Sequence, residues 1–199
     1  MGKSTLALQL AGMIADAPGH DGGPGGLHVA YVSGEESAAQ LRDRAARLGV
    51  GSPTLSVLNA SSLDAVLEQL GAAAARGARC AAVVIDSIQA MALDAVDAGA
   101  GSPSQVRECA VRLLQFAKAH ATTVVLIGHV TKSNELAGPR MLEHLVDCVL
   151  YMDGEVSYSH RLLRCTKNRF GSTSEVREPR ARARRDTAAV ASCRSQCWR

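Results

Sequence analysis

Short β-rich runs alternate with longer amphipathic stretches from residue 2 to about residue 158, and this alternation constrains the fold more than any other feature. Such a pattern is typical of βαβ units, in which helices connect parallel strands. Hydrophobic residues make up 47% of the 199 residues, but aromatic residues only 3%. The core must therefore be built from Val, Ile, Leu and Ala, which suits a buried parallel sheet covered by helices.

The pattern predicts six strands and four helices. The strands cover residues 28–33, 54–58, 81–86, 123–128, 147–152 and 160–167. The helices cover residues 4–16, 36–48, 62–76 and 104–120, and Ser104 is expected to cap the last of them. These elements predict a single α/β domain over residues 1–175, with a mostly parallel sheet flanked by helices.

The last segment, residues 176–199, differs in composition. Seven Arg and two acidic residues lie within residues 177–199, so this stretch carries +5 while the preceding 176 residues carry −2 of the formal net charge of +3. It has no apolar period, which predicts a disordered basic tail. A basic arm that binds phosphate is the alternative. Because the positive charge belongs to the tail, it does not indicate that the domain binds nucleic acid.

The six cysteines are scattered, and none forms the CxxC pair that commonly starts a zinc site. We expect small core residues or free thiols, and no zinc site in this chain. No apolar run reaches the roughly 18 residues that a membrane span requires, and the sequence does not open with a signal peptide. These features predict a cytoplasmic protein without a membrane partner.

Gly2, Lys3, Ser4 and Thr5 lead directly into an apolar-periodic helix and match the end of the phosphate-binding loop GxxxxGK[ST]. In that motif backbone amides hold phosphates, the Lys neutralises them and the hydroxyl binds Mg²⁺. A GKS tripeptide alone is weak evidence, and the helix that follows strengthens it. Since the first part of the motif and its strand are not in the sequence, we expect a core without its first strand and half of its phosphate loop.

Two acidic segments follow predicted strands. Asp86 ends the apolar run VVID, as in a Walker B site, where the carboxylate positions Mg²⁺. The alternative is a capping Asp. In YVSGEES, Glu35 and Glu36 stand after another strand, and one of them could activate an attacking water. Because S-x-x-E is also a capping pattern, we assign the general base to Glu35 and the cap to Glu36.

His129 lies at the end of the predicted strand in LIGHVTK. At the ligand edge of a sheet, a His beside Gly and a Thr-Lys pair is suited to sensing a γ-phosphate. A structural or solvent-facing His is the alternative.

These motifs, with SPSQVREC, AGPRMLEHLVDCVLYMDGE and KNRFGST, resemble the RadA (Sms) family of RecA-like P-loop ATPases over about residues 2–175. The resemblance implies ATP and Mg²⁺ as cofactors, a homo-hexameric ring on single-stranded DNA, and DNA-dependent ATP hydrolysis that drives branch migration in recombinational repair. It also implies the following roles: nucleotide ligands at Gly2, Lys3, Ser4 and Thr5, Mg²⁺ at Ser4 and Asp86, catalysis at Glu35, and a sensor at His129.

By the same resemblance, Lys167 and Arg169 of KNRFG reach a neighbouring subunit's nucleotide or the DNA. Two cations two residues apart on an extended segment point the same way, and a planar Arg can stabilise phosphoryl charge across an interface. A solvated Lys and Arg at a strand end is the alternative. Residues 132–140 occupy the place of a DNA-binding loop, and Lys132 and Arg140 are its only cations. A plain connecting loop is the alternative there.

The sequence also departs from the family. Members usually carry an N-terminal four-cysteine zinc finger and a C-terminal domain shaped like the Lon protease, and neither is in this sequence. With half of the phosphate loop missing, we expect weak ATP hydrolysis by this chain alone. Two other functions are compatible with the motifs: an inactive fragment of such an ATPase, and a RecA-like ATPase with a signalling role, which KNRFG disfavours.

Overall fold

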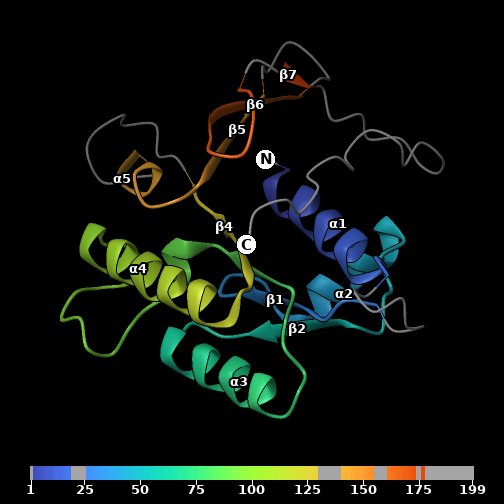
Figure 1. Cartoon of the computed structure of the whole chain (residues 1–199), viewed down its shortest axis with the longest axis horizontal. Coiled ribbons are helices and arrows are strands. Elements are labelled where there is room, and N and C mark those ends of the chain that lie inside the picture. Colours follow the sequence, from blue (N-terminus) through green and yellow to red (C-terminus); the bar gives the residue numbers. More distant parts are fainter. Residues whose placement is uncertain (1, 19–25, 130–139, 155–160, 174–175, 178–199) are drawn as a thin grey trace.

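The computed structural model describes residues 2–18, 26–129, 140–154, 161–173 and 176–177. In these residues a four-stranded parallel sheet carries helices on both faces, and a separate three-stranded antiparallel sheet follows it in the chain (Figure 1). The predicted α/β class and helix-flanked parallel sheet are confirmed. In the described segments no helix has the length and apolar character needed to span a bilayer.

The parallel sheet has the order β2-β1-β3-β4. Its strands are β1 Val29–Ser33, β2 Leu55–Asn59, β3 Ala82–Asp86 and β4 Thr123–Ile127. In the register of the three strands that matter most for the site, Ser33 pairs with Asp86 and Asp86 pairs with Ile127. The carboxyl ends of these strands therefore lie side by side, at the edge where α/β proteins bind ligands.

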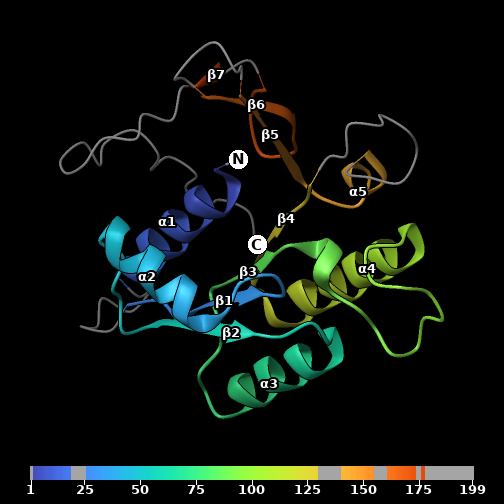
Figure 2. The same cartoon turned by 180° about the vertical axis from the view of Figure 1, so that it is seen from behind.

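Helices cover the two faces of this sheet. They are α1 Lys3–Ala15, α2 Ala38–Leu48, α3 Leu63–Ala75, the short 3₁₀ helix η1 Ile88–Ala90 and α4 Pro103–His120. Val29 and Tyr31 of β1 pack in the same cluster as α1 and α2, whereas Ala30 and Val32 pack with α3 and α4. This alternation follows from the two-residue period of a strand. The helix pairs lie on opposite sides in Figures 1 and 2.

Helix α4 begins earlier than the sequence predicts. Its N-cap is Ser102, whose side chain accepts a hydrogen bond from the amide of Gln105, and Pro103 occupies the first turn. The prediction of Ser104 as the cap is wrong because Pro is well suited to the first helical position, so the cap stands just before it. The side chain of Gln105 is buried; its amide oxygen accepts a hydrogen bond from the Leu93 amide and its amide nitrogen donates one to the Leu93 carbonyl.

The antiparallel sheet is formed by β5 Cys148–Gly154, β6 Arg161–Asn168 and β7 Val176–Arg177, and α5 Arg140–Glu143 precedes it. Both long strands were predicted, but not their separation from the parallel sheet. Strand β7 also extends regular structure past residue 175, where the domain was expected to end. The predicted tail covers residues 176–199; its first two residues form β7, and residues 178–199 lie outside the described residues.

Candidate nucleotide-binding site

The N-terminus of α1 differs from those of the other long helices. Helices α2, α3 and α4 each follow a Ser whose side chain accepts a hydrogen bond from a first-turn amide. Helix α1 instead follows Gly2, which has a left-handed backbone with φ of 113°, and no side-chain cap is found in the described residues. Gly tolerates this φ without strain. The first-turn amides of α1 can therefore bind an anion, which the helix dipole also favours.

Asp86 and the start of α1 are connected through a buried tyrosine. The phenol of Tyr31 donates a hydrogen bond of 2.6 Å to Oδ2 of Asp86, and the phenol oxygen of Tyr31 also lies 3.4 Å from the carbonyl oxygen of Ser4. Tyr31 is fully buried and Asp86 nearly so. Burial, followed by the hydrogen bond to Asp86, raises the pKa of Tyr31 above its usual range. The predicted meeting of the GKS helix and the VVID strand is therefore present in the structure.

Glu35 lies beside the residue that follows Asp86. The hydroxyl of Ser87 donates a hydrogen bond of 2.5 Å to Oε1 of Glu35, and Nε2 of His129 lies 3.8 Å from the same carboxylate oxygen. The side chains of Glu35 and His129 are both about half exposed. Three strand ends thus contribute Glu35, Ser87 and His129 to one cluster that solvent and a ligand can reach.

The backbone of His129 is held by Gln89 of η1. The side-chain amide of Gln89 donates to the carbonyl of His129 at 3.1 Å, and its oxygen accepts from the amide of His129 at 3.3 Å. This two-way contact imitates the pairing of a strand residue. It fixes the position at which the chain leaves β4.

The turn after β1 approaches η1 so closely that only Gly fits. A Cβ atom on Gly34 would lie 2.6 Å from Cβ of Ala90 and 3.2 Å from the carbonyl oxygen of Ala90. The amide of Gly34 also donates to the carbonyl of Asp86 at 3.1 Å. These contacts determine how close Glu35 comes to Ser87.

Glu36 is not the helix cap that the sequence predicts. Helix α2 begins after Ser37, which forms a capping box with Gln40. The side chain of Glu36 pairs with Arg44, and its carbonyl oxygen accepts a hydrogen bond from Asn59 at 2.6 Å. The prediction is wrong because S-x-x-E and a second pattern, S-x-x-Q, overlap here, and the later one caps the helix. Glu35 lies in the open cluster, and its assignment as the general base stays a prediction.

The donor set at this edge fits a phosphate chain with Mg²⁺. The first-turn amides of α1 are neutral hydrogen-bond donors and the Lys3 ammonium is a cation, so both suit phosphate; the Ser4 hydroxyl and the Asp86 carboxylate are the hard oxygen ligands that Mg²⁺ prefers. Mg²⁺ in such sites is held by one or two protein ligands together with substrate phosphates. Among the residues with described positions, no group of three or more His, Cys, Asp or Glu side chains could hold a metal ion.

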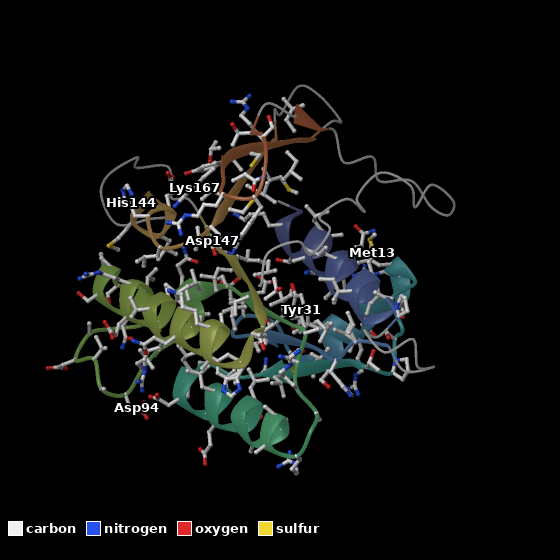
Figure 3. All side chains as sticks on the ribbon, in the orientation of Figure 1. Met13, Tyr31, Asp94, His144, Asp147 and Lys167 are labelled. Carbon is white, nitrogen blue, oxygen red and sulfur yellow. The ribbon has the colours of Figure 1, made fainter. Side chains whose placement is uncertain are left out.

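Lys167 of the KNRFG motif lies on β6, and Figure 3 shows it in the same part of the molecule as His144 and Asp147, apart from Tyr31. Nζ of Lys167 donates to the carbonyl of Glu143 at 2.5 Å, and Arg169 forms an ion pair of 2.8 Å with Asp147. Glu143 is the last residue of α5 and Asp147 directly precedes β5. Lys167 lies on β6, whereas Arg169 follows the end of that strand at Asn168. The predicted common direction of the two cations stays a prediction.

The predicted DNA-binding residues are incompletely visible. Lys132 lies outside the described residues. Arg140 is the first residue of α5 rather than part of a loop, and its side chain is not described. The structure therefore does not test this prediction.

Sequence reasoning missed Tyr31 and Gln89 and gave Ser87 no role. Tyr31 was counted within an apolar strand, and Gln89 within the segment after VVIDS. The strand register could have identified Tyr31. Because Ser33 pairs with Asp86, Tyr31 lies on the strand next to Asp86 and on the same face of the sheet as Asp86. That register is not visible in a single sequence.

Comparisons with known proteins agree with this architecture. The family described as AAA domain matches residues 1–135. The DNA repair protein RadA of Bacillus subtilis (strain 168) is 41% identical over 176 residues, which cover 88% of this chain and 36% of that protein. RadA of Listeria monocytogenes serovar 1/2a is 43% identical over 176 residues, with the same coverage. The chain thus spans about a third of the length of these curated relatives.

A solved structure has a similar fold. The crystal structure of a KaiC-like protein from the archaeon Pyrococcus horikoshii OT3 matches with a TM-score of 0.65. The match covers 89% of this chain and 80% of that one, with 19% sequence identity. Likeness at this identity concerns the fold alone, and together with the AAA domain match it is consistent with the predicted RecA-like α/β core.

Proposed function

This chain belongs to the AAA domain family and is a RadA-type sequence, and from that premise we propose that it is the nucleotide-binding core of an ATP-driven DNA repair motor. The motor acts on single-stranded DNA and on branched recombination intermediates, where hydrolysis drives branch migration in the cytoplasm. The observation that carries the proposal is the convergence at one sheet edge of the α1 N-terminus, Asp86 and the Glu35 cluster.

In this function each residue of the site has a role that follows from its position. The first-turn amides of α1 and Lys3 bind the phosphates of ATP, and Ser4 and Asp86 hold Mg²⁺, which supplies neutralising charge. Glu35 orients and deprotonates the attacking water, and its hydrogen bond from Ser87 fixes the carboxylate. His129 senses the γ-phosphate next to this carboxylate. Support comes from the short contacts of Glu35 and from its exposure.

Lys167 and Arg169 act across a subunit boundary in this proposal. Each already binds a partner inside its own chain, the Glu143 carbonyl and the Asp147 carboxylate. The Arg169 pair is largely exposed, so solvent screens it and it can be exchanged at low cost for a phosphate on a neighbouring subunit. The homo-hexameric ring, and DNA contacts by Lys132 and Arg140, are further parts of the proposal.

The proposal is tested by titrating a fluorescent ATP analogue in the presence and absence of single-stranded DNA. We expect Mg²⁺-dependent binding that responds to the DNA. Lys3→Ala removes the positive charge that binds the phosphates. It should weaken binding by about 10-fold or more, since hydrogen bonds to charged groups contribute about 1.5–3 kcal/mol. Lys118→Ala, at an exposed position on α4, is the matched control and should bind like the parent chain.

The other outcomes separate the alternative functions. A chain that binds no nucleotide under any condition is an inactive fragment. A chain that binds nucleotide without any response to DNA fits a signalling ATPase and contradicts the DNA motor.

A further inference from the structure

Tyr31 is a core residue whose side chain also reaches a carboxylate at the end of the neighbouring strand. It lies in β1 with its side chain on the α1 face of the sheet, in the same cluster as Ala82 and Val84 of β3 (Figure 3). Because strand residues alternate between faces, Asp86 of β3 has its side chain on that face as well. The register pairs Tyr31 with Val84, two residues before Asp86. The long phenol side chain spans this offset and reaches the carboxylate at the strand end.

The hydrogen bond has one strong direction. A phenol has a single proton to donate, and at 2.6 Å the Asp86 oxygen Oδ2 receives it, while the Ser4 carbonyl oxygen at 3.4 Å has only a weak contact. The bond therefore occupies one carboxylate oxygen and fixes the side-chain rotamer. The other oxygen, Oδ1, is left for a ligand.

We propose that Tyr31 is a positioning residue for a Mg²⁺ site. By its hydrogen bond, Tyr31 holds the Asp86 carboxylate in line with the first turn of α1 at Ser4. The proposal rests on the proposed nucleotide site, and it adds a residue that acts through Asp86 rather than by contact with the ion. Its physical basis is that Asp86 is only 4% exposed. A buried carboxylate without a donor would rotate or draw in water, and the distance between Asp86 and Ser4 would no longer be fixed.

The test uses Tyr31→Phe, which removes one oxygen and keeps the ring in the core. Binding of a fluorescent ATP analogue is measured across a Mg²⁺ titration and again in EDTA. We expect the half-saturating Mg²⁺ concentration to rise about 10-fold, the factor typical of a lost hydrogen bond to a charged group. Affinity in EDTA should stay within about 2-fold of the parent chain. A general loss of packing would weaken binding in both conditions, so this split distinguishes positioning from stability.

Tyr151→Phe is the matched control. Its phenol also donates a 2.6 Å hydrogen bond to a carboxylate, Oε1 of Glu143, but on the antiparallel sheet. We expect an unchanged Mg²⁺ dependence for this variant. If Tyr31→Phe has the same Mg²⁺ dependence as the parent chain, the proposal is wrong while the nucleotide site stands. If the parent chain itself shows no Mg²⁺-dependent binding, both the proposed function and this inference fail.

Two readouts do not depend on activity. In a nucleotide-free crystal structure of Tyr31→Phe, the Asp86 carboxylate should occupy a second rotamer, and a single unchanged rotamer contradicts the proposal. If Tyr31→Phe does not fold, the parent chain labelled with 3-fluorotyrosine answers the question. The ¹⁹F resonance of Tyr31 should shift when Mg²⁺ is added to the ADP complex, and that of Tyr151 should not. A Tyr31 resonance that stays in place overturns the inference.

Discussion

Gly34 lies where the turn after β1 meets η1, and Gly34→Ala should damage both stability and catalysis. The added Cβ would lie 2.6 Å from Cβ of Ala90, whereas ordinary contacts begin at 3.4 Å. Its next neighbours are Cε of Met91 at 3.0 Å, which can move, and the Ala90 carbonyl at 3.2 Å, which is backbone. The turn and η1 must therefore separate by about 1 Å. Overpacking of this kind costs about 1–3 kcal/mol in the free energy of unfolding.

The same displacement acts on the catalytic cluster. Glu35 follows Gly34 directly, and its carboxylate is held 2.5 Å from the Ser87 hydroxyl. A misplacement of about 1 Å can lower a catalytic rate by about 100-fold. We therefore expect a reduced urea midpoint together with a kcat for ATP hydrolysis that falls by about that factor. The fall in kcat should exceed any change in nucleotide affinity, because the three nearest neighbours of the added methyl group belong to Ala90 and Met91 and not to α1.

Gly71→Ala is a control that should change the free energy of unfolding in the opposite direction. It lies within α3, and a Cβ at this position meets no atom within 4 Å. Gly71→Ala should raise the free energy of unfolding by about 0.5–1 kcal/mol, because Ala loses less backbone entropy in a helix. If Gly34→Ala unfolds at the same urea concentration as the parent and hydrolyses ATP at the same rate, the close approach at η1 does not position Glu35.

Three further predictions concern other parts of the chain. Glu35→Gln keeps an oxygen that accepts from Ser87, so nucleotide affinity should stay within about 2-fold, while kcat falls by about 10²–10⁴ because the base is lost; Glu68→Gln on α3 should change neither. Ser102→Ala removes the α4 cap and should lower the free energy of unfolding by about 1 kcal/mol in urea titrations. Burial raises the pKa of Cys109 to about 11, so iodoacetamide at pH 8 should modify the exposed Cys148 in the native chain and Cys109 only after unfolding.

The regular elements of the core were predictable from two signals, the apolar runs of the strands and the apolar period of the helices. β1 has the sequence VAYVS and β3 the sequence AVVID, so both are mainly apolar and contain two Val each, and all five residues of each strand are buried. The helix predicted over residues 4–16 is observed at Lys3–Ala15, because an apolar period follows a Gly. Burial on both faces leaves such strands few alternatives.

The caps and the second sheet were harder to predict, for different reasons. Several Ser residues near a helix start match the same capping pattern, and which one caps depends on where the preceding turn ends, as with Ser37 and Ser102. Strands β5 and β6 show a strand pattern, but that pattern does not specify a partner. They follow each other in the chain and pair antiparallel, from Gly154 with Arg161 to Cys148 with Asn168, but their apolar pattern does not distinguish this pairing from addition to the parallel sheet.

The candidate site was partly predictable because its charged residues stand directly after strands. Lys3, Glu35 and Asp86 were identified from local motifs. In the structure Glu35 contacts Ser87 beside Asp86, and Tyr31 connects Asp86 with Ser4, the residue after Lys3. The roles assigned to these residues stay predictions. Tyr31 could not be distinguished from a core residue, because its function depends on one oxygen atom at the end of a buried ring. Residues that act through another side chain leave no pattern of their own in the sequence.

The geometry of this site follows from counting along the chain from the end of the sheet. Ser33, Asp86 and Ile127 form one row of paired residues at the ends of three strands. Glu35 and His129 each stand two residues beyond that row, and Ser87 one residue beyond it, so the three side chains reach the same region without any long connecting loop. An inserted residue after any one strand would rotate its functional side chain away from the others. Short exits from a rigid parallel sheet therefore determine the cluster more than the identity of the surrounding residues does.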